Sequence, residues 1–287
     1  MGMDACTLCP RMCGVNRAAG EKGYCGMDAT IRAARAALHM WEEPCISGTR
    51  GSGAVFFSGC SLRCIFCQNF EIAEGNCAKE ISGERLSEIF LELQEQGAAN
   101  INLVTAAHYV PAVIESLKKA KAQGMDLPVI YNSSGYERVE TVQMLEEVVD
   151  VWLPDFKYMD SKLAFAYSRA KDYPEVARAA IREMMKAAGT CAYDEDGYIQ
   201  KGVIVRHLIL PGHTKNSIAV LDELYGTYGD DLTISLMNQY TPLPQVRNIP
   251  DLNRRVTKRE YEKVLDHALD LGERKIIRQL KRFLETV

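Results

Sequence analysis

The sequence has 287 residues, of which 47% are hydrophobic, enough for one large core with a small appendage. Its 34 Lys and Arg residues and 38 Asp and Glu residues are interspersed and give a net charge of −4, so nothing favours binding to nucleic acid or an anionic membrane. No apolar run reaches the roughly 18 residues of a membrane span, and cysteines occupy the place of a secretory apolar region, so we expect a cytoplasmic protein.

Four closely spaced cysteines lie near the amino terminus, in the pattern Cys-x2-Cys-x3-Cys-x11-Cys. They are Cys6, Cys9, Cys13 and Cys25. The residues around them are rich in Gly, Arg and Pro and too few to enclose a core, so a bound metal would have to supply the folding free energy. Zinc and an iron-sulfur centre both accept four thiolates, and the pattern does not choose between them. Loose thiols without metal are the remaining alternative.

Three further cysteines follow the apolar run 54–58, which is typical of a buried strand. Cys60, Cys64 and Cys67 have the spacing Cys-x3-Cys-x2-Cys, with the aromatic Phe66 before the last. A cubane of four irons needs four ligands, so three thiolates leave one iron open to another ligand. If that ligand is a small molecule, the cluster can pass an electron to it. The alternatives are a fourth cysteine that closes the cluster for electron transfer, and zinc bound by the three.

This loop resembles that of the radical S-adenosylmethionine (radical SAM) superfamily, whose signature is Cys-x3-Cys-x2-Cys with an aromatic residue before the third cysteine. The run Cys64-Ile-Phe-Cys-Gln-Asn69 is similar to the pyruvate formate-lyase activating enzymes and their relatives, over about residues 45–250. The resemblance implies that S-adenosyl-L-methionine (SAM) chelates the open iron of a 4Fe-4S cluster. Its cleavage would give methionine and a 5'-deoxyadenosyl radical, which takes a hydrogen atom from a substrate. The radical is borne by the cofactor, so no catalytic side chain is implied.

Apolar runs alternate with amphipathic stretches over the rest of the chain. The expected strands are 54–58, 101–105, 128–132, 151–155, 203–210 and 232–237, and stretches such as 86–93 and 110–117 have the spacing of helices with one buried face. Such alternation predicts parallel strands joined by right-handed crossovers, hence an α/β fold with a partial six-stranded barrel of the TIM type. Ligands of such folds gather at the carboxyl ends of the strands, where the cysteine triplet lies.

Two charged residues end the fourth expected strand. Asp155 and Lys157 are two positions apart, so their side chains project to the same side. A carboxylate beside an ammonium can bind a zwitterionic or hydroxyl-rich ligand, or the two can form an ion pair in the barrel mouth. The resemblance implies that this Asp-x-Lys pair contacts SAM.

Other strand ends carry further candidate residues. Arg206 lies in an apolar strand before Pro211-Gly212, where a lone arginine needs an anion. The resemblance implies that it binds the SAM carboxylate, and an internal salt bridge is the alternative. Asn132 and Ser134, in the run 132–135, could contact ribose hydroxyls or form a simple turn.

Two assignments depart from the pattern of the relatives. The second strand ends in the run 105–108, closed by His108, where most superfamily members have Gly-Gly-Glu to receive the methionine amine. His108 either replaces that motif or caps the next helix. Asn238 ends the sixth strand where relatives place a histidine that binds the cofactor.

The remaining features complete the domain organisation. The chain is expected to divide into a Cys-rich extension (1–45), a radical SAM barrel (46–250) and a carboxyl-terminal helical extension (251–287) that begins with a capping box at Thr257 and Glu260. Residues 161–188 should form two helices broken near Tyr173-Pro174. Cys45, Cys77 and Cys191 are taken as incidental thiols.

The expected function is SAM cleavage for hydrogen abstraction, in which the substrate would be a glycine of a glycyl radical enzyme. One alternative is modification of a peptide or small molecule with help from a second metal centre, zinc or iron-sulfur. Another is a non-enzymatic electron-transfer protein. The enzyme would need an electron donor such as flavodoxin or ferredoxin and, because such clusters decay in oxygen, an anaerobic host.

Overall fold

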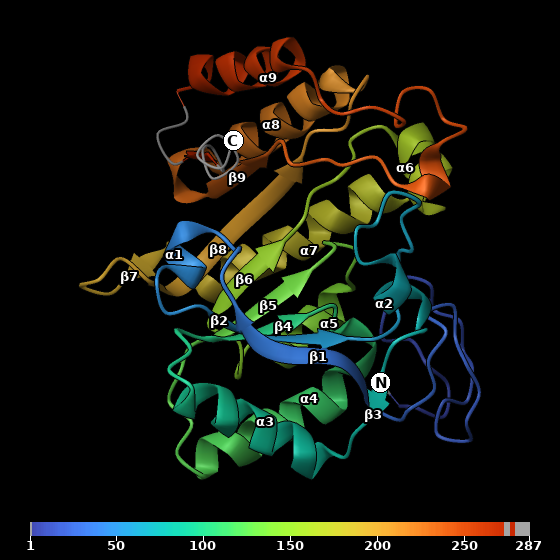
Figure 1. Ribbon diagram of the computed structural model, residues 1–287, viewed down its shortest axis with the longest axis vertical. Helices are drawn as coiled ribbons and strands as arrows, with labels where there is room; N and C mark the ends of the chain where they lie inside the picture. The colour runs from blue at the N-terminus through green and yellow to red at the C-terminus, as the bar shows by residue number, and fades with distance from the viewer. Residues whose placement is uncertain (1, 273–275, 279–287) are drawn as a thin grey trace.

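A curved sheet crosses the centre of the molecule (Figure 1), and it is described here from a computed structural model over residues 2–272 and 276–278. Within these residues the strand order is β10-β9-β8-β6-β5-β4-β2-β1-β3, with β7 paired to β8. The strands are β1 Arg32–His39, β2 Ser52–Phe57, β3 Lys79–Glu80, β4 Ile101–Val104, β5 Val129–Ser133, β6 Val151–Pro154, β7 Ala192–Tyr193, β8 Ile199–Leu208, β9 Thr233–Met237 and β10 Ile276–Arg278.

The six strands that the sequence predicts all form, and they pair in parallel from β2 through β4, β5, β6 and β8 to β9. Every residue of β5 and β6 is buried, as expected for strands covered on both faces. The prediction of an α/β fold with a partial six-stranded parallel barrel is therefore confirmed.

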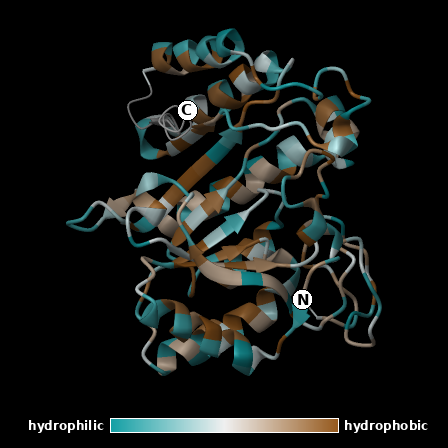
Figure 2. Ribbon diagram, in the orientation of Figure 1, coloured by the Kyte–Doolittle hydropathy of each residue, from teal (hydrophilic) through white to brown (hydrophobic). Residues whose placement is uncertain are grey.

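Helices cover the outer face of this sheet, and Figure 1 shows α3 and α4 below it and α8 and α9 above it. The helices are α1 Pro44–Ser47, α2 Phe70–Glu74, α3 Gly83–Glu95, α4 Val110–Ala122, α5 Val139–Leu145, α6 Ser161–Ser168, α7 Tyr173–Ala188, α8 Thr214–Tyr228 and α9 Lys258–Asp270. Short 3-10 turns lie at Ala107–Tyr109, Gly229–Asp231 and Pro244–Val246. Figure 2 shows hydrophobic strands and hydrophilic outward helix surfaces, the pattern of a core between the two layers.

Local signals in the sequence explain several helix boundaries. The side chain of Asp160 accepts backbone N–H groups and begins α6, and Pro174 stands in the first turn of α7, so the predicted two-helix segment is confirmed. The predicted capping box of Thr257 and Glu260 begins α9. Tyr261, Val264 and Ala268 are the buried residues of that helix, whereas Leu269 is 44% exposed.

Some strands lie outside the predicted pattern. β1 pairs antiparallel with β2, so residues 32–39, assigned from the sequence to the Cys-rich extension, are part of the sheet. β7 and the start of β8 form an antiparallel hairpin that the expected strands did not include. Within the described residues 2–31 neither a helix nor a strand forms.

The short helix α1 lies on the inner face of the sheet, in front of β6 and β8 in Figure 1. Its Ile46 is fully buried against Ile130, Leu153 and Ile204 of the barrel strands. The segment that precedes the first barrel strand therefore fills the barrel interior.

Parts of the carboxyl-terminal prediction cannot be compared. Residues 273–275 and 279–287 of the expected extension (251–287) lie outside the described residues. Among the helices that are described, none combines the length and apolar character needed to cross a membrane.

Candidate functional site

The three cysteines Cys60, Cys64 and Cys67 lie together in a loop that begins where β2 ends. The thiols of Cys64 and Cys67 interact electrostatically with each other and with the thiol of Cys60. The backbone N–H of Leu62 donates to Cys60 Sγ at 3.4 Å. Burial raises the pKa of Cys64, and raises that of Cys67 to about 12. Partly buried thiols are costly to ionise alone, so a metal or a cation beside them would favour the thiolates.

Phe66, the aromatic residue inside the motif, anchors this loop. It is buried and meets the rings of Tyr158, Tyr167 and Tyr240 edge-on, with centroids 6.2–6.4 Å apart. Four rings packed in this way fix the loop against the helical layer and keep water from one side of the thiols.

Polar contacts to Cys64 come from two directions. The Ser168 hydroxyl, at the end of α6, donates to Cys64 Sγ at 3.0 Å and lies 2.8 Å from the Tyr158 hydroxyl. The Lys157 ammonium lies near enough to favour the thiolates of Cys64 and Cys67. Three gathered thiols with a hydrogen-bond donor and a cation beside them fit a 4Fe-4S cluster bound by this loop.

A group of buried charges lies next to this loop at the ends of β6 and β8. Lys157 Nζ is 2.5 Å from one Asp155 oxygen, and Arg206 Nε is 2.9 Å from the other. Burial opposes ionisation of Asp155, but Arg206 and Lys157 outweigh it and hold its pKa below the usual value. Burial also opposes the charge of Lys157, but Asp155 and Cys64 raise its pKa. Both internal ion pairs that the sequence left as alternatives are thus present, and contact with SAM stays a prediction.

Glu42 and Glu43, which sequence reasoning missed, complete this group from the segment before α1. Glu42 Oε2 lies 3.2 Å from Arg206 Nη1, and its Oε1 accepts from Asn132 Nδ2 at 3.4 Å. Burial raises the pKa of Glu42 and of Glu43, and Arg206 opposes the rise at both. The two acidic residues lie outside every barrel strand, so strand-end reasoning had no access to them. The available signal was an acidic pair beside a proline in an otherwise apolar stretch.

The remaining predicted residues at strand ends fall into two sets. Asn132 belongs to the charged group, because its Oδ1 accepts from Arg206 Nη2 at 2.6 Å. Ser134 lies in the following turn, where its hydroxyl accepts from the Tyr136 N–H at 3.4 Å. Asn238 follows β9 and is partly exposed.

His108 lies beneath the cysteine loop, and its predicted role at the methionine amine stays a prediction. The ring is 2% exposed, and its Nε2 lies 2.6 Å from the carbonyl oxygen of Ser58, just before the cysteine loop. Burial lowers its pKa to about 3, so the imidazole is neutral. His108 therefore supports the base of the loop. Thr105, at the end of β4, has a φ of 62°, a left-handed conformation that is strained for a β-branched residue.

The four amino-terminal cysteines are also brought together, beside the loop and apart from its three thiols. Cys9 is within electrostatic range of Cys6 and Cys25, and Cys25 is within range of Cys6 and Cys13. All except Cys13 are buried. Among the described residues, however, no group of three or more His, Cys, Asp or Glu side chains is arranged around a single ion position, in either thiol group.

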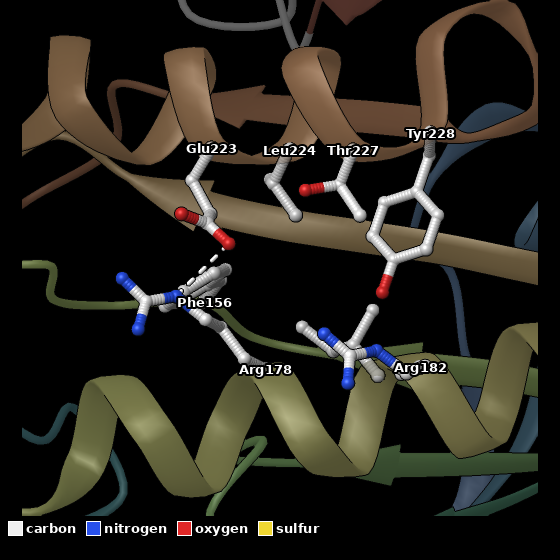
Figure 3. Close-up of a pocket in the computed structure, with 8 residues that line it drawn as sticks. Phe156, Arg178, Arg182, Glu223, Leu224, Thr227 and Tyr228 are labelled. Carbon is white, nitrogen blue, oxygen red and sulfur yellow. Dashed lines mark ion pairs between the residues drawn. The ribbon is translucent and has the colours of Figure 1, made fainter.

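A surface pocket lies elsewhere, between α7 and α8 (Figure 3). Arg178 and Glu223 point toward each other across it at 2.9 Å, beside Arg182 and Tyr228. It lies on the outer helical layer and none of its lining residues is a cysteine, so it is not the candidate site.

Several known proteins are similar to this chain. MJ0674, an uncharacterized protein of Methanocaldococcus jannaschii, is 29% identical over 270 residues, which cover 92% of this chain and 74% of that protein. HydG, a maturase of the FeFe-hydrogenase, has a similar fold, with a TM-score of 0.52 and 16% identity over 74% of this chain and 48% of HydG. This chain therefore spans about half the length of HydG. A domain of pyruvate-formate lyase-activating enzyme from Bacteroides vulgatus gives a TM-score of 0.42, with 18% identity over 59% of this chain and 91% of that domain.

Residues 54–224 match the family described as the Radical SAM superfamily. The matched segment begins in β2, contains the three-cysteine loop and runs to the end of the buried part of α8. The chain is a member of the Radical SAM superfamily.

Proposed function

We propose that this enzyme cleaves SAM reductively and uses the product radical to take a hydrogen atom from a substrate. A 4Fe-4S cluster held by Cys60, Cys64 and Cys67 would supply the electron for cleavage to methionine and a 5'-deoxyadenosyl radical. The observation that carries the proposal is a loop with three gathered thiols at the carboxyl end of β2.

The charged group beside the loop supports SAM as the ligand. Its three carboxylates, Asp155, Glu42 and Glu43, face the two cations Arg206 and Lys157. SAM carries a sulfonium, an ammonium and one carboxylate, so it has a net positive charge that would balance this excess of acid. Arg206 and Lys157 can orient the ligand's carboxylate, while the acidic side chains hold its ammonium.

The protein's own task in this reaction is orientation and exclusion of water. The aromatic group around Phe66 closes one side of the loop. A radical formed there would be shielded from solvent on that side.

The test is an anaerobic incubation of reconstituted, reduced protein with SAM, followed by measurement of 5'-deoxyadenosine. We expect the nucleoside from the wild type and none from a Cys60→Ala, Cys64→Ala and Cys67→Ala variant. If the wild type, with its cluster content verified, forms no more than that variant does, the chain is an electron-transfer protein and the proposal is wrong.

For the substrate, we propose a glycine of a partner glycyl radical enzyme. The motif Cys64-Ile-Phe-Cys-Gln-Asn69, similar to that of the pyruvate formate-lyase activating enzymes, supports this choice. An external donor such as flavodoxin or ferredoxin would reduce the cluster. Co-expression with candidate partners should give a glycyl signal in electron paramagnetic resonance. Silence with every candidate would instead favour a peptide or small-molecule substrate, for which the neighbouring amino-terminal thiols are the supporting observation.

A further inference from the structure

We propose that Cys6, Cys9, Cys13 and Cys25 bind a second metal centre as thiolates, and that this centre holds the amino-terminal segment (residues 2–31) against the catalytic loop (residues 59–67). The proposal is independent of SAM cleavage and of the choice of substrate. It concerns a site that the family match, which begins at residue 54, does not include.

The first observation is how tightly the segment is built around its sulfur atoms. A Cβ atom at Gly23 would lie 2.8 Å from Cys13 Sγ and 3.9 Å from Cys25 Sγ, so only glycine leaves the sulfurs room. The backbone of Arg11 hydrogen-bonds the Cys9 thiol, and the Met12 N–H donates to the Cys9 carbonyl at 3.0 Å. Amide groups directed at a thiol in a tight turn are typical of thiolate-metal loops.

The second observation is a buried positive charge that no carboxylate pairs with among the described residues. Arg17 is 1% exposed. Its guanidinium donates to the carbonyl oxygens of His108 and Asp28, and lies 3.8 Å from Cys6 Sγ. Its Nε is buried with no hydrogen-bond acceptor in the described structure.

Neutral carbonyl groups do not compensate a buried guanidinium, which is strongly unfavourable unless an anion is nearby. Four thiolates on a divalent zinc ion, or on an iron-sulfur cluster, carry a net negative charge. Arg17 lies beside Cys6 and acts electrostatically on Cys25. A negatively charged metal-thiolate centre at these cysteines is therefore the anion that this guanidinium requires.

The third observation is where the segment docks. Arg11 donates to the carbonyl oxygens of Ser61, Ser168 and Arg169 at 2.6–2.9 Å, and thereby bridges the catalytic loop and α6. Gly59, with a φ of 88°, has room for no side chain, because a Cβ there would lie 2.9 Å from the carbonyl oxygen of Cys25. The backbone that carries Cys25 thus lies against the residue that precedes Cys60.

These contacts give the centre a structural role. The segment has no helix or strand among its described residues, so its position depends on side-chain contacts and on whatever binds its thiols. Zinc and an iron-sulfur cluster are both bound by four thiolates, so the donor set of this site fits either one. The experiment distinguishes the two.

The test uses the full chain, purified anaerobically, in which Cys60, Cys64 and Cys67 are all replaced by Ala. Zinc, iron and acid-labile sulfide are measured per chain. We expect this variant to retain either about one zinc ion or iron together with sulfide, and either result supports the site. Adding Cys9→Ala and Cys13→Ala should remove that metal. Adding Cys77→Ala and Cys191→Ala instead, the matched control, should leave it bound.

Two results would overturn the proposal. One is a triple variant that is folded by circular dichroism but binds no metal, and the other is metal that persists after Cys9→Ala and Cys13→Ala. Neither result bears on 5'-deoxyadenosine formation by the wild type. Arg17→Met offers a test that leaves all thiols in place, and it should weaken metal retention against a chelator by about 10- to 100-fold. The exposed Arg35→Met serves as its control.

Discussion

The catalytic loop and the amino-terminal segment both bring thiols together, but different structural contacts hold the two in place. The loop continues a buried parallel strand and is locked by the aromatic packing of Phe66. The segment has no regular structure in its described part and is attached through Arg11 and through the backbone at Cys25. The three-thiol loop is thus held in place by the fold. The four-thiol segment, by contrast, has few such supports, and under our proposal the metal that it binds supplies part of its stability.

The buried arginines differ in the same way. Arg206, beside the catalytic loop, is paired with the carboxylates of Asp155 and Glu42. Arg17, in the segment, has carbonyl groups, the Cys6 sulfur and the ring of Tyr109 around it, and no carboxylate pairs with it among the described residues. Carboxylates of the protein balance the charge of Arg206. For Arg17, we propose that the metal-thiolate centre supplies the balancing negative charge.

The largest effect should come from single cysteine substitutions in the two groups. Cys64→Ala is expected to abolish 5'-deoxyadenosine formation, because it removes a ligand of the cluster that supplies the electron. Cys9→Ala should lower product formation but keep the paramagnetic resonance signal of the reduced catalytic cluster. Loss of that signal in Cys9→Ala would mean that the two thiol groups form one centre, and the comparison would fail.

Removal of the two buried arginines should separate their roles. Arg206→Met leaves Glu42 without its ion-pair partner and Asp155 with Lys157 as its remaining cation, and it should lower the free energy of unfolding by about 3–5 kcal/mol. Adding Glu42→Gln should restore part of the loss.

Arg17→Met should destabilise the metal-loaded protein by more than the metal-free protein, in denaturant titrations of both forms. Equal losses in both forms would contradict the assignment of Arg17 to a metal-thiolate centre.

A pH dependence should arise where the barrel meets the segment. Arg138 Nη1 donates to the carbonyl of Thr7 at 2.7 Å, and the neighbouring Glu137 is 2% exposed. Burial raises the pKa of Glu137 from 4.5 to about 8. Because the pKa of Glu137 is raised in the folded state, the free energy that this side chain contributes to stability is fully present below pH 4.5. That contribution is lost as the pH rises toward about 8.

We therefore expect Glu137→Gln to flatten the fall in stability between those pH values. Chemical denaturation at a series of pH values, for this variant and for the exposed Glu147→Gln control, measures the slopes. An unchanged slope in Glu137→Gln would contradict the assignment.

The smallest effect concerns the Ser168 hydroxyl at Cys64 Sγ. Hydrogen bonds to cluster sulfurs raise the reduction potential, so Ser168→Ala should shift the midpoint of the catalytic cluster to a more negative value. Thr141→Val removes a hydroxyl that donates to the Leu8 carbonyl in the segment and should leave the midpoint unchanged. A redox titration followed by paramagnetic resonance compares the two, and a shift of equal size in both would remove Ser168 from this role.

Much of the barrel could be predicted because its strands are continuous apolar runs. All six expected parallel strands form, and the cysteine triplet lies at the carboxyl end of the first. β1 was not predicted, since its sequence Arg32–His39 is short of large apolar residues and takes its strand conformation from pairing with β2. Tertiary context decides such strands, which local propensity cannot identify.

The site was predicted only where a residue ends a barrel strand. Asp155, Lys157, Arg206 and Asn132 meet as that rule requires. Glu42 and Glu43 reach the same place from outside the barrel strands, and His108 turns under the loop toward Ser58. Both outcomes depend on long-range packing, which spacing along the chain does not encode.

The open ligand position at the three-thiol loop is tested most directly by paramagnetic resonance of the reduced cluster in the variant that lacks Cys9 and Cys13, before and after addition of SAM. The account predicts a clear change in the spectrum, because SAM would occupy a position that no protein group fills. A spectrum that is identical with and without SAM, at full cluster occupancy, would contradict it.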